Sequence, residues 1–225
     1  MIGLIKIITD ICIANKIKFL MINGTLVGSW RHHDMIPWDE DADFLMYVDD
    51  QPLFINALKE SKYSEVGYTL LPFSKRPQRS FKVYFHNTTC VKANCPWKFP
   101  SVDIILYSTD KNYLWFTDNR RIRIDLKYVF PITVRPLCSL WLPAPRDPLR
   151  LLPPTIDSIC RTHVNNHRFE RRQKSKKCKC SDLYNVYPFV QRTGLNMTIE
   201  ALVINQKIIH IVIYPLSQEI LGYNQ

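Results

Sequence analysis

The sequence lacks the features that would place it among membrane-spanning, repetitive or disordered proteins. No apolar run approaches the ~18 residues of a transmembrane helix, and no internal repeat or low-complexity segment is present. Apolar residues make up 46% and charged residues 22% of the 225 residues, which are ordinary values for a globular protein. This length favours one large domain over two small ones.

The amino terminus also lacks the features of a secretory signal peptide. Asp10 interrupts the apolar stretch, and no small-residue cleavage site follows it. Apolar side chains share one helical face at Ile5, Ile8, Ile11 and Cys12. We therefore expect an amphipathic helix over residues 2–14. With no targeting segment visible, the ends of the sequence do not indicate a localisation, and it stays open whether the chain is a fragment of a longer, anchored protein.

The positive charge is confined to the second half of the chain. Residues 1–110 contain 12 Lys and Arg and 12 Asp and Glu, whereas residues 111–225 contain 18 and 8, which accounts for the whole net charge of +10. The second half is therefore expected to meet an anion or to form a solvated basic surface. Its densest run, Arg168–Lys179, is expected to be exposed, either as a solvated tail or as a segment that binds an anionic acceptor.

The number of cysteines is seven, so at least one is free or pairs elsewhere. Cys12 lies in an apolar segment and is expected to be a buried free thiol. Cys90 and Cys95 flank a four-residue loop and are candidates for a local disulfide. Three more cysteines, Cys160, Cys178 and Cys180, bracket a basic stretch that also contains His163 and His167. For these three, disulfides, free thiols and a zinc site that includes His163 all stay open.

The first half of the chain alternates between helical and extended patterns. Helices are expected over residues 2–14, 26–31 and 52–61. Strands are expected over residues 17–22, 41–48, 64–71, 80–86 and 102–107. This order is typical of a mixed α/β (α+β) domain in which helices flank a mixed sheet.

After residue 110 the pattern is less regular. The seven prolines between Pro131 and Pro154 predict a mostly extended loop. A short strand is expected over residues 122–126 and a helix over residues 155–165. A terminal hairpin that turns at Asn205-Gln206 is expected within residues 199–213.

The stretch between Asn23 and Asp43 carries the residues that point to chemistry. A strand that ends in Gly24-Thr25 at the start of a helix leaves backbone N–H groups free to face an anion such as phosphate. Asp41 and Asp43 are two residues apart on an expected strand, so their carboxylates point to one face and repel each other. A bound divalent cation is the usual reason to tolerate such a pair.

Asp103 is a lone charge in an apolar strand. If that strand lies beside residues 41–48, Asp103 becomes a third carboxylate on the same face, and such a set suits one or two Mg²⁺ ions that act on a nucleotide. A Gly-Thr pair by itself is typical of a plain turn, and an acidic segment by itself is typical of a solvated loop. The order and spacing in which the turn, the acidic segment and Asp103 occur together favour a functional site. Four basic residues between the two strands either bind a phosphate group or form a solvated loop: Lys75, Arg76, Arg79 and Lys82.

A longer motif resembles a known family. Gly24-Thr25-Leu26-Val27-Gly28, then Arg31-His32, then Ile36-Pro37-Trp38-Asp39-Glu40-Asp41-Ala42-Asp43 resemble the LicD family, which includes bacterial phosphocholine transferases, fukutin and fukutin-related protein. A weaker similarity extends to Asp103, and the resemblance covers residues 1–130. It implies a nucleotidyltransferase-like catalytic domain in residues 1–150, and a less regular, basic C-terminal extension in residues 151–225 that packs on the same domain.

The resemblance also implies a role for each matching residue. The implied nucleotide-binding residues are Gly24, Thr25, Gly28 and Arg31. Among them, Gly24 and Thr25 form the phosphate turn, and Arg31 pairs with phosphate or locks the acidic loop. The implied catalytic residues are Asp39, Asp41, Asp43 and Asp103. The last three hold Mg²⁺ or Mn²⁺, and either Asp39 or Asp103 acts as the base.

By this resemblance the chain is expected to be a metal-dependent transferase. It would move a phosphocholine or ribitol phosphate group from a CDP-activated donor to a hydroxyl of a glycan or glycoprotein. Two alternatives stay open. The first is a nucleotidyltransferase that acts on nucleic acid, which the positive charge favours but the Arg-His and Pro-Trp segments do not. The second is a non-catalytic scaffold with a basic binding tail. The implied localisation is the secretory pathway (Golgi or ER lumen), or the cytoplasm for a bacterial-type protein.

Overall fold

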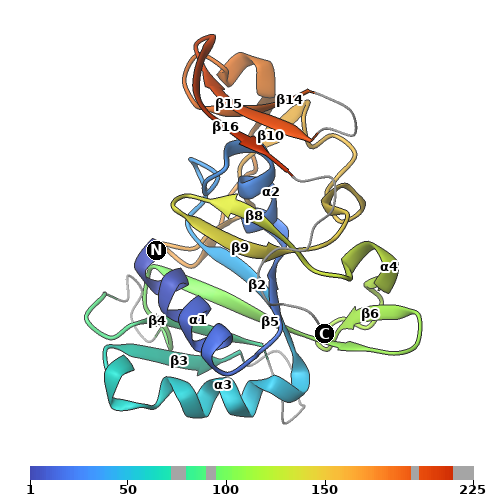
Figure 1. The fold of residues 1–225 in the computed structure, drawn as a ribbon. Coiled ribbons are helices and arrows are strands. Elements are labelled where there is room, and N and C mark those ends of the chain that lie inside the picture. Colours follow the sequence, from blue (N-terminus) through green and yellow to red (C-terminus); the bar gives the residue numbers. More distant parts are fainter. Residues whose placement is uncertain (72–79, 90–94, 194–197, 215–225) are drawn as a thin grey trace.

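A mixed β-sheet brings the two aspartate-bearing strands side by side (Figure 1). The structure is a computed structural model and describes residues 1–71, 80–89, 95–193 and 198–214. The strands lie in the order β1 (Phe19–Met21), β2 (Ala42–Tyr47), β5 (Ser101–Thr109), β4 (Phe81–Phe85) and β3 (Val66–Leu70). β2 and β5 are parallel, and the other neighbours are antiparallel. β5 also pairs with β6 (Tyr113–Phe116), which pairs with β7 (Arg123–Asp125).

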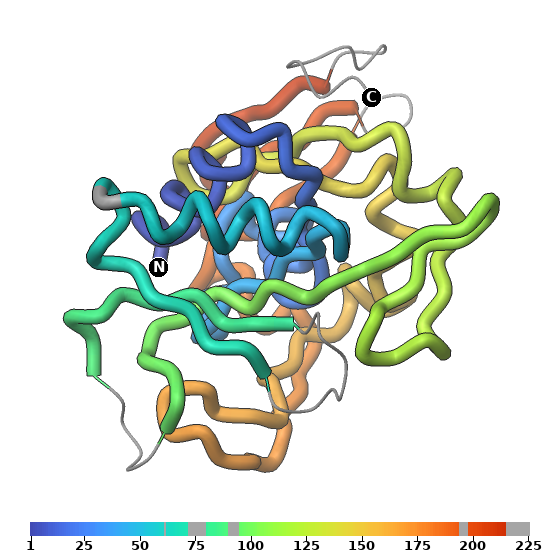
Figure 2. The backbone as a smooth tube through the Cα atoms, turned by 90° about the horizontal axis from the view of Figure 1, so that it is seen from below, coloured from blue at the N-terminus to red at the C-terminus, as the bar shows by residue number. Residues whose placement is uncertain are grey.

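Both faces of this sheet are buried, because apolar side chains alternate along its strands. α1 (Ile2–Ala14) and α3 (Gln51–Leu58) pack on one face, where they meet Phe44 of β2, and Figure 2 shows the two helices as neighbours. Leu45 points to the other face, toward α4 (Leu126–Val129). The expected helix over residues 2–14, its buried face and the mixed α/β fold with flanking helices are confirmed.

The proline-rich stretch forms a β-hairpin where an extended loop was expected. β8 (Thr133–Leu137) pairs with β9 (Leu140–Ala144), and Pro136 and Pro143 lie within these strands. Each strand of a two-stranded ribbon has one free edge, so a residue without a backbone N–H is tolerated there.

Residues 155–165 do not form the expected helix. β10 (Ile159–Arg161) pairs instead with β13 (Lys177–Lys179), and the disulfide between Cys160 and Cys180 joins the same two segments. β11 (Asn165–Asn166) and β12 (Arg171–Arg172) form a second short ladder between them. These long-range pairings outweigh the local helical pattern.

A three-stranded antiparallel sheet ends the described chain. It consists of β14 (Phe189–Thr193), β15 (Ile199–Ile204) and β16 (Lys207–Ile213), and it lies above α2 (Asn23–His32) in Figure 1. The expected hairpin at Asn205-Gln206 is confirmed, and both turn residues have the positive φ angles, 46° and 63°, that a tight hairpin turn requires. Within the described residues, no helix is long and apolar enough to cross a bilayer.

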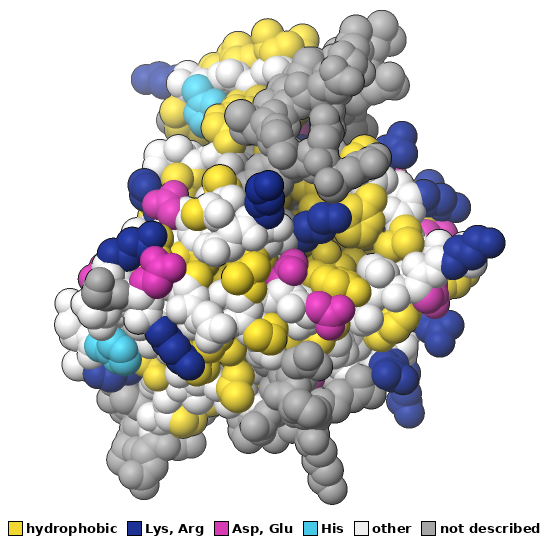
Figure 3. Space-filling model, turned by 60° about the horizontal axis from the view of Figure 1, so that its bottom comes forward, with side chains coloured by type: hydrophobic (Ala, Val, Ile, Leu, Met, Phe, Trp, Pro, Cys, Tyr) yellow, Lys and Arg dark blue, Asp and Glu magenta, His cyan; other side chains and the backbone are white. Residues whose placement is uncertain are grey.

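Lysine and arginine side chains do not form one continuous patch on the face of the molecule shown in Figure 3. They are spread there among acidic and apolar side chains. On that face, the basic side chains are therefore dispersed.

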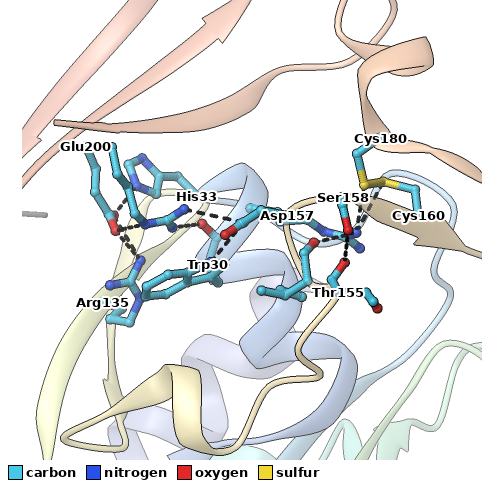
Figure 4. Close-up of polar contacts among 12 residues, drawn as sticks. Trp30, His33, Arg135, Thr155, Asp157, Ser158, Cys160, Cys180 and Glu200 are labelled. Atoms are coloured by element: carbon cyan, nitrogen blue, oxygen red, sulfur yellow. Dashed lines mark hydrogen bonds and ion pairs between the residues drawn. A yellow bond between two sulfur atoms is a disulfide. The ribbon is translucent and has the colours of Figure 1, made fainter.

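A buried carboxylate attaches the three-stranded sheet to the end of α2 (Figure 4). Glu200 of β15 is 1% exposed and accepts hydrogen bonds from Arg135 of β8 and Arg192 of β14, each at 2.9 Å. His33 Nε2 lies 2.7 Å from Glu200 Oε2. Burial alone would raise the pKa of Glu200, but the hydrogen bond from His33 and the two arginine charges lower that pKa to about 2.

The last turn of α2 makes further contacts with the C-terminal extension. Trp30 Nε1 donates to Asp157 Oδ1 at 3.1 Å, and the guanidinium of Arg192 lies 3.5 Å from the centre of the Trp30 ring. His32 Nδ1 lies 2.7 Å from the carbonyl oxygen of Pro188. Hydrogen bonds and ring contacts therefore join the extension to α2. The expected domain boundary at residue 150 stays a prediction.

Glu200→Gln is expected to lower the free energy of unfolding by about 3–5 kcal/mol, because it leaves buried guanidinium groups without their counter-charge. Since the pKa of Glu200 is lowered from 4.5 to about 2, its contribution is present above pH 4.5 and is lost as the pH falls toward 2. Urea unfolding at pH 7 measures the difference. Asp10→Asn, which breaks an exposed ion pair with Lys6, is the matched control and should cost under ~1 kcal/mol. Equal costs for the two variants would contradict the role of Glu200.

Candidate active site

Three aspartates meet near the start of the parallel strand pair. The register places Asp43 of β2 beside Asp103 of β5, so both side chains leave the same face of the sheet. Asp41 directly precedes β2, and one carboxylate oxygen from each aspartate lies within 4.8 Å of the others. Asp41 is buried, and the other two are partly buried. The structure therefore brings these three residues together.

The first turn of α2 packs against these carboxylates. Thr25 Oγ1 accepts a hydrogen bond from the backbone N–H of Asp43 at 2.7 Å, which fixes the helix start against β2. A Cβ at Gly24 would lie 2.5 Å from Asp39 Oδ2, so a larger residue would displace that carboxylate. Gly24 and Thr25 thus belong to the first turn of the helix, where the partial positive charge of the helix dipole favours anions.

Burial and mutual repulsion raise the pKa values of the carboxyl groups. Burial first, and then the charges of Asp103 and Asp39, raise the pKa of Asp41 to about 8. Burial and the charge of Asp41 raise the pKa of Asp43 well above its ordinary range, and burial raises the pKa of Asp39. Ionising all of these carboxyl groups is therefore unfavourable without a further positive charge beside them, and a bound cation would supply that charge.

Two basic side chains of the described chain contact the aspartates. Lys82 of β4 is buried and donates to Asp103 Oδ1, and its Nζ lies 5.4 Å from the centre of the Trp97 ring. His167 Nε2 lies 3.1 Å from Asp41 Oδ2. For Lys82 the solvated-loop alternative is therefore wrong, because this residue lies in a buried strand. The other three members of that basic group lie outside the described residues.

Gly28 has a packing role in the structure, and its implied contact with a nucleotide stays a prediction. A Cβ at this position would lie 2.4 Å from the carbonyl oxygen of Asp34 and 3.0 Å from the backbone nitrogen of Ile36. The absence of a side chain lets the loop after α2 fold back against the helix.

Arg31 contacts the C-terminal extension. Its Nη1 donates to the carbonyl oxygen of Ile156 at 3.3 Å and lies 3.2 Å from Cys160 Sγ and 3.4 Å from Cys180 Sγ. Burial lowers the pKa of Arg31 to about 10, so the guanidinium stays charged at neutral pH. Arg31 therefore holds the C-terminal extension, and its implied pairing with phosphate or with the acidic loop stays a prediction.

The disulfide between Cys160 and Cys180 excludes the zinc site that the sequence left open, because a disulfide sulfur is not a thiolate ligand. The sequence contained the three cysteines but did not indicate which two pair. Cys12 is a buried free thiol, as expected. The expected pair of Cys90 and Cys95 is not described, because Cys90 lies outside the described residues.

The acidic loop is the segment between α2 and β2, and it contains Trp38, Asp39, Glu40 and Asp41. A cavity of about 240 Å³ lies beside this loop and is lined in part by Trp38. Its walls include the apolar side chains of Trp38, Leu183 and Tyr187, and its basic lining residues are Arg161, Lys176 and Lys177. Trp38 Nε1 donates to the carbonyl oxygen of Arg161 at 3.0 Å, which ties the loop to this cavity. The lining residues in the described chain include no Asp or Glu. Part of the basic run therefore lines a cavity whose surface is mostly apolar.

The three aspartates fit a hard divalent cation. Carboxylate oxygens are the ligands that Mg²⁺ and Mn²⁺ prefer, and one oxygen from each of Asp41, Asp43 and Asp103 converges on one point. Burial first, and then mutual repulsion, raise the pKa values of Asp41 and Asp43, and a bound cation would offset both effects.

Comparison with known proteins assigns this region to a family. The model of the family described as LicD/FKTN/FKRP, nucleotidyltransferase domain, matches residues 16–147, which is more than half of the chain. The lipopolysaccharide cholinephosphotransferase LicD of Haemophilus influenzae is 39% identical over 46 residues, a match that covers 20% of this chain and 17% of that protein. The matched residues 16–147 include α2 and the three aspartates, whereas His167 and Glu200 lie beyond them. The chain therefore belongs to the LicD family, as the motif between Gly24 and Asp43 predicted.

Proposed function

We propose that the chain is a metal-dependent transferase that moves a phospho-alcohol group from a CDP-activated donor to a hydroxyl of a glycan or glycoprotein. The similarity to a cholinephosphotransferase favours phosphocholine as the transferred group, with ribitol phosphate as the second candidate. The observation that carries the proposal is the convergence of Asp41, Asp43 and Asp103 beside the first turn of α2.

Each residue of the cluster has a role in this proposal. Asp41, Asp43 and Asp103 would hold Mg²⁺ or Mn²⁺ with one oxygen each. When bound, the cation offsets the negative charge of the reacting phosphate. The first-turn amides of α2, at Gly24 and Thr25, have no acceptor within the helix and would bind phosphate oxygens of the donor.

The acceptor hydroxyl needs a base, and two carboxylates are within the site. Asp103 is paired with Lys82, so we favour Asp39, whose pKa is raised by burial. In the proposed step, the acceptor oxygen bonds to the donor phosphorus that carries the alcohol, and the proton of the acceptor hydroxyl passes to Asp39. The bond between that phosphorus and the oxygen that bridges it to CMP breaks, and CMP leaves with the electron pair of this bond.

We place the acceptor in the cavity beside Trp38. This tryptophan is three residues before Asp41, so the cavity and the carboxylates share one loop. Aromatic walls with Arg161, Lys176 and Lys177 suit a sugar that carries an anionic group. The disulfide between Cys160 and Cys180 supports an oxidising compartment, which we propose to be the secretory pathway.

The central experiment measures CMP release from CDP-choline and CDP-ribitol with Mn²⁺ and a glycan acceptor. Asp43→Asn is expected to lower the rate on the order of 100–1,000-fold, because it removes a charge that holds the cation. Asp182→Asn, at an exposed position, is the control and should match the wild type. A preference for CTP or ATP with a nucleic acid acceptor would favour the nucleotidyltransferase alternative. A wild type that binds neither Mn²⁺ nor nucleotide would favour the scaffold.

The carboxylate cluster should also make stability depend on pH and metal. Because the folded-state pKa of Asp43 is raised and that of Asp41 is about 8, the cost of ionising the cluster grows as the pH rises from about 4 to 8. In metal-free buffer, Asp43→Asn should therefore raise the Tm at pH 8 by about 2–4 °C, the shift that ~1 kcal/mol gives in a chain of this size, and change it little at pH 4. Differential scanning fluorimetry measures both values.

Mn²⁺ in the same assay should raise the wild-type Tm more at pH 8 than at pH 5, because the carboxyl groups must lose their protons to bind. The Asp182→Asn variant should follow the wild-type profile. A metal-induced shift of the same size at both values of pH would count against a carboxylate site.

Gly24→Ala should weaken Mn²⁺-dependent binding of CDP by about tenfold, or ~1.4 kcal/mol, because its Cβ would lie 2.5 Å from Asp39 Oδ2. The Tm should not fall, since alanine is a better helix former than glycine. Gly3→Ala is the matched control, because a Cβ at Gly3 meets nothing within 4 Å. Isothermal titration calorimetry gives the affinities. Equal CDP affinities in the two variants would place the phosphate away from this turn.

A further inference from the structure

We propose that the disulfide-closed hairpin from Cys160 to Cys180 completes the metal centre, with His167 as the positioning residue for Asp41. This inference rests on the proposed metal-dependent function. It assigns a part of the centre to residues that follow the family-matched region, which ends at residue 147.

The primary observation is the contact between His167 and Asp41. His167 Nε2 lies 3.1 Å from Asp41 Oδ2, and the two side chains are only 13% and 10% exposed. His163 stacks on His167 with ring centres 5.1 Å apart, and its Nδ1 lies 3.2 Å from His167 Nε2. His163 Nδ1 also lies 3.3 Å from both the backbone nitrogen and the carbonyl oxygen of Asn165. His167 Nε2 therefore has two polar neighbours, His163 Nδ1 and the Asp41 carboxylate.

Independent contacts fix the hairpin over the acidic loop. The backbone N–H of Arg168 donates to Glu40 Oε2 at 3.2 Å, directly beside the His167 contact. In the same turn of the hairpin, Trp97 Nε1 donates to Glu170 Oε1 at 2.8 Å. Two hydrogen bonds therefore hold the turn that carries His167.

A disulfide closes the base of the hairpin, and an arginine side chain lies against it. Cys160 and Cys180 join its two ends, and the guanidinium of Arg31 from α2 lies against both sulfurs. Opening the disulfide releases the ends of a segment whose inner strands are only two or three residues long. Such short ladders are not stable by themselves. The disulfide therefore determines how firmly His167 is held.

The chemical consequence concerns the carboxylate of Asp41. The contact of His167 Nε2 with Oδ2 restrains the rotation of the carboxylate. Hydrogen-bond partners of metal ligands typically contribute 10–100-fold to metal affinity, because without them the ligand must be ordered when the metal binds. His167 is not one of the three converging ligands, and its effect acts through Asp41.

The test measures the affinity of the metal-free full chain for Mn²⁺ by isothermal titration calorimetry. His167→Ala should weaken the affinity 10–100-fold. His167→Gln, which keeps an N–H donor, should recover part of the loss, and this variant gives the answer if the alanine variant does not fold. His163→Ala is the matched control: it removes the stacked ring but keeps the His167 contact with Asp41, and it should change the affinity less than threefold.

A second pair of variants tests the disulfide. The double variant Cys160→Ser, Cys180→Ser should lose as much Mn²⁺ affinity as His167→Ala, and adding His167→Ala to it should cause little further loss. Cys178→Ser is the control, because Cys178 is exposed and lies outside the disulfide.

The outcomes separate this inference from the function on which it rests. Wild-type affinity in His167→Ala, with binding lost in Asp43→Asn, would overturn the role of the hairpin and leave the aspartate site standing. Equal losses in His163→Ala and His167→Ala would also overturn it, since the effect would then be general to the hairpin fold. A wild type that binds no Mn²⁺ would overturn both the hairpin's role and the proposed metal dependence.

Discussion

Helix α2 links the two parts of the molecule, because its first turn contacts the aspartates and its last turn contacts the C-terminal extension. The first turn lies against the carboxylates through Thr25 and Gly24, and the last turn carries the charged guanidinium of Arg31. This arrangement has the favourable sign at both ends, since the amino end of a helix attracts anions and the carboxyl end attracts cations. A helix of ten residues spans ~15 Å and is stiff, so it sets the separation between the aspartates and the anchor of the C-terminal extension.

Two buried acidic sites of this chain have opposite electrostatic character. Glu200 faces two guanidinium groups and His33, and its pKa falls to about 2. Asp41 faces other carboxylates, and its pKa rises to about 8. Both sites are desolvated, so the number of compensating positive charges decides the direction of the shift. The charge of Glu200 is balanced by the protein itself, which is the condition for a structural role, whereas the aspartate cluster has room for the charge of a cation.

Sequence reasoning succeeded where the evidence was local and failed where it depended on pairing across the chain. The spacing of Asp41 and Asp43, the helix over residues 2–14 and the hairpin at Asn205-Gln206 follow from short-range periodicity and turn chemistry. Arg31 could not be placed, because its partners are more than 120 residues away. For Glu200, a lone charge in the apolar alternation of β15 was a usable signal of burial, but its arginine partners come from two other strands.

The loop between α2 and β2 shows why the extension is more than a solvated tail. At its start, His33 adopts a left-handed conformation and contacts Glu200. In its middle, Trp38 donates to the carbonyl oxygen of Arg161, and at its end Asp41 meets His167. Exposed side chains such as Arg171 keep the solvated character expected of the basic run. The same run therefore has an outer face in solvent and an inner face against the loop. The family-matched region supplies the carboxylates, and the extension restrains the loop that carries Asp41.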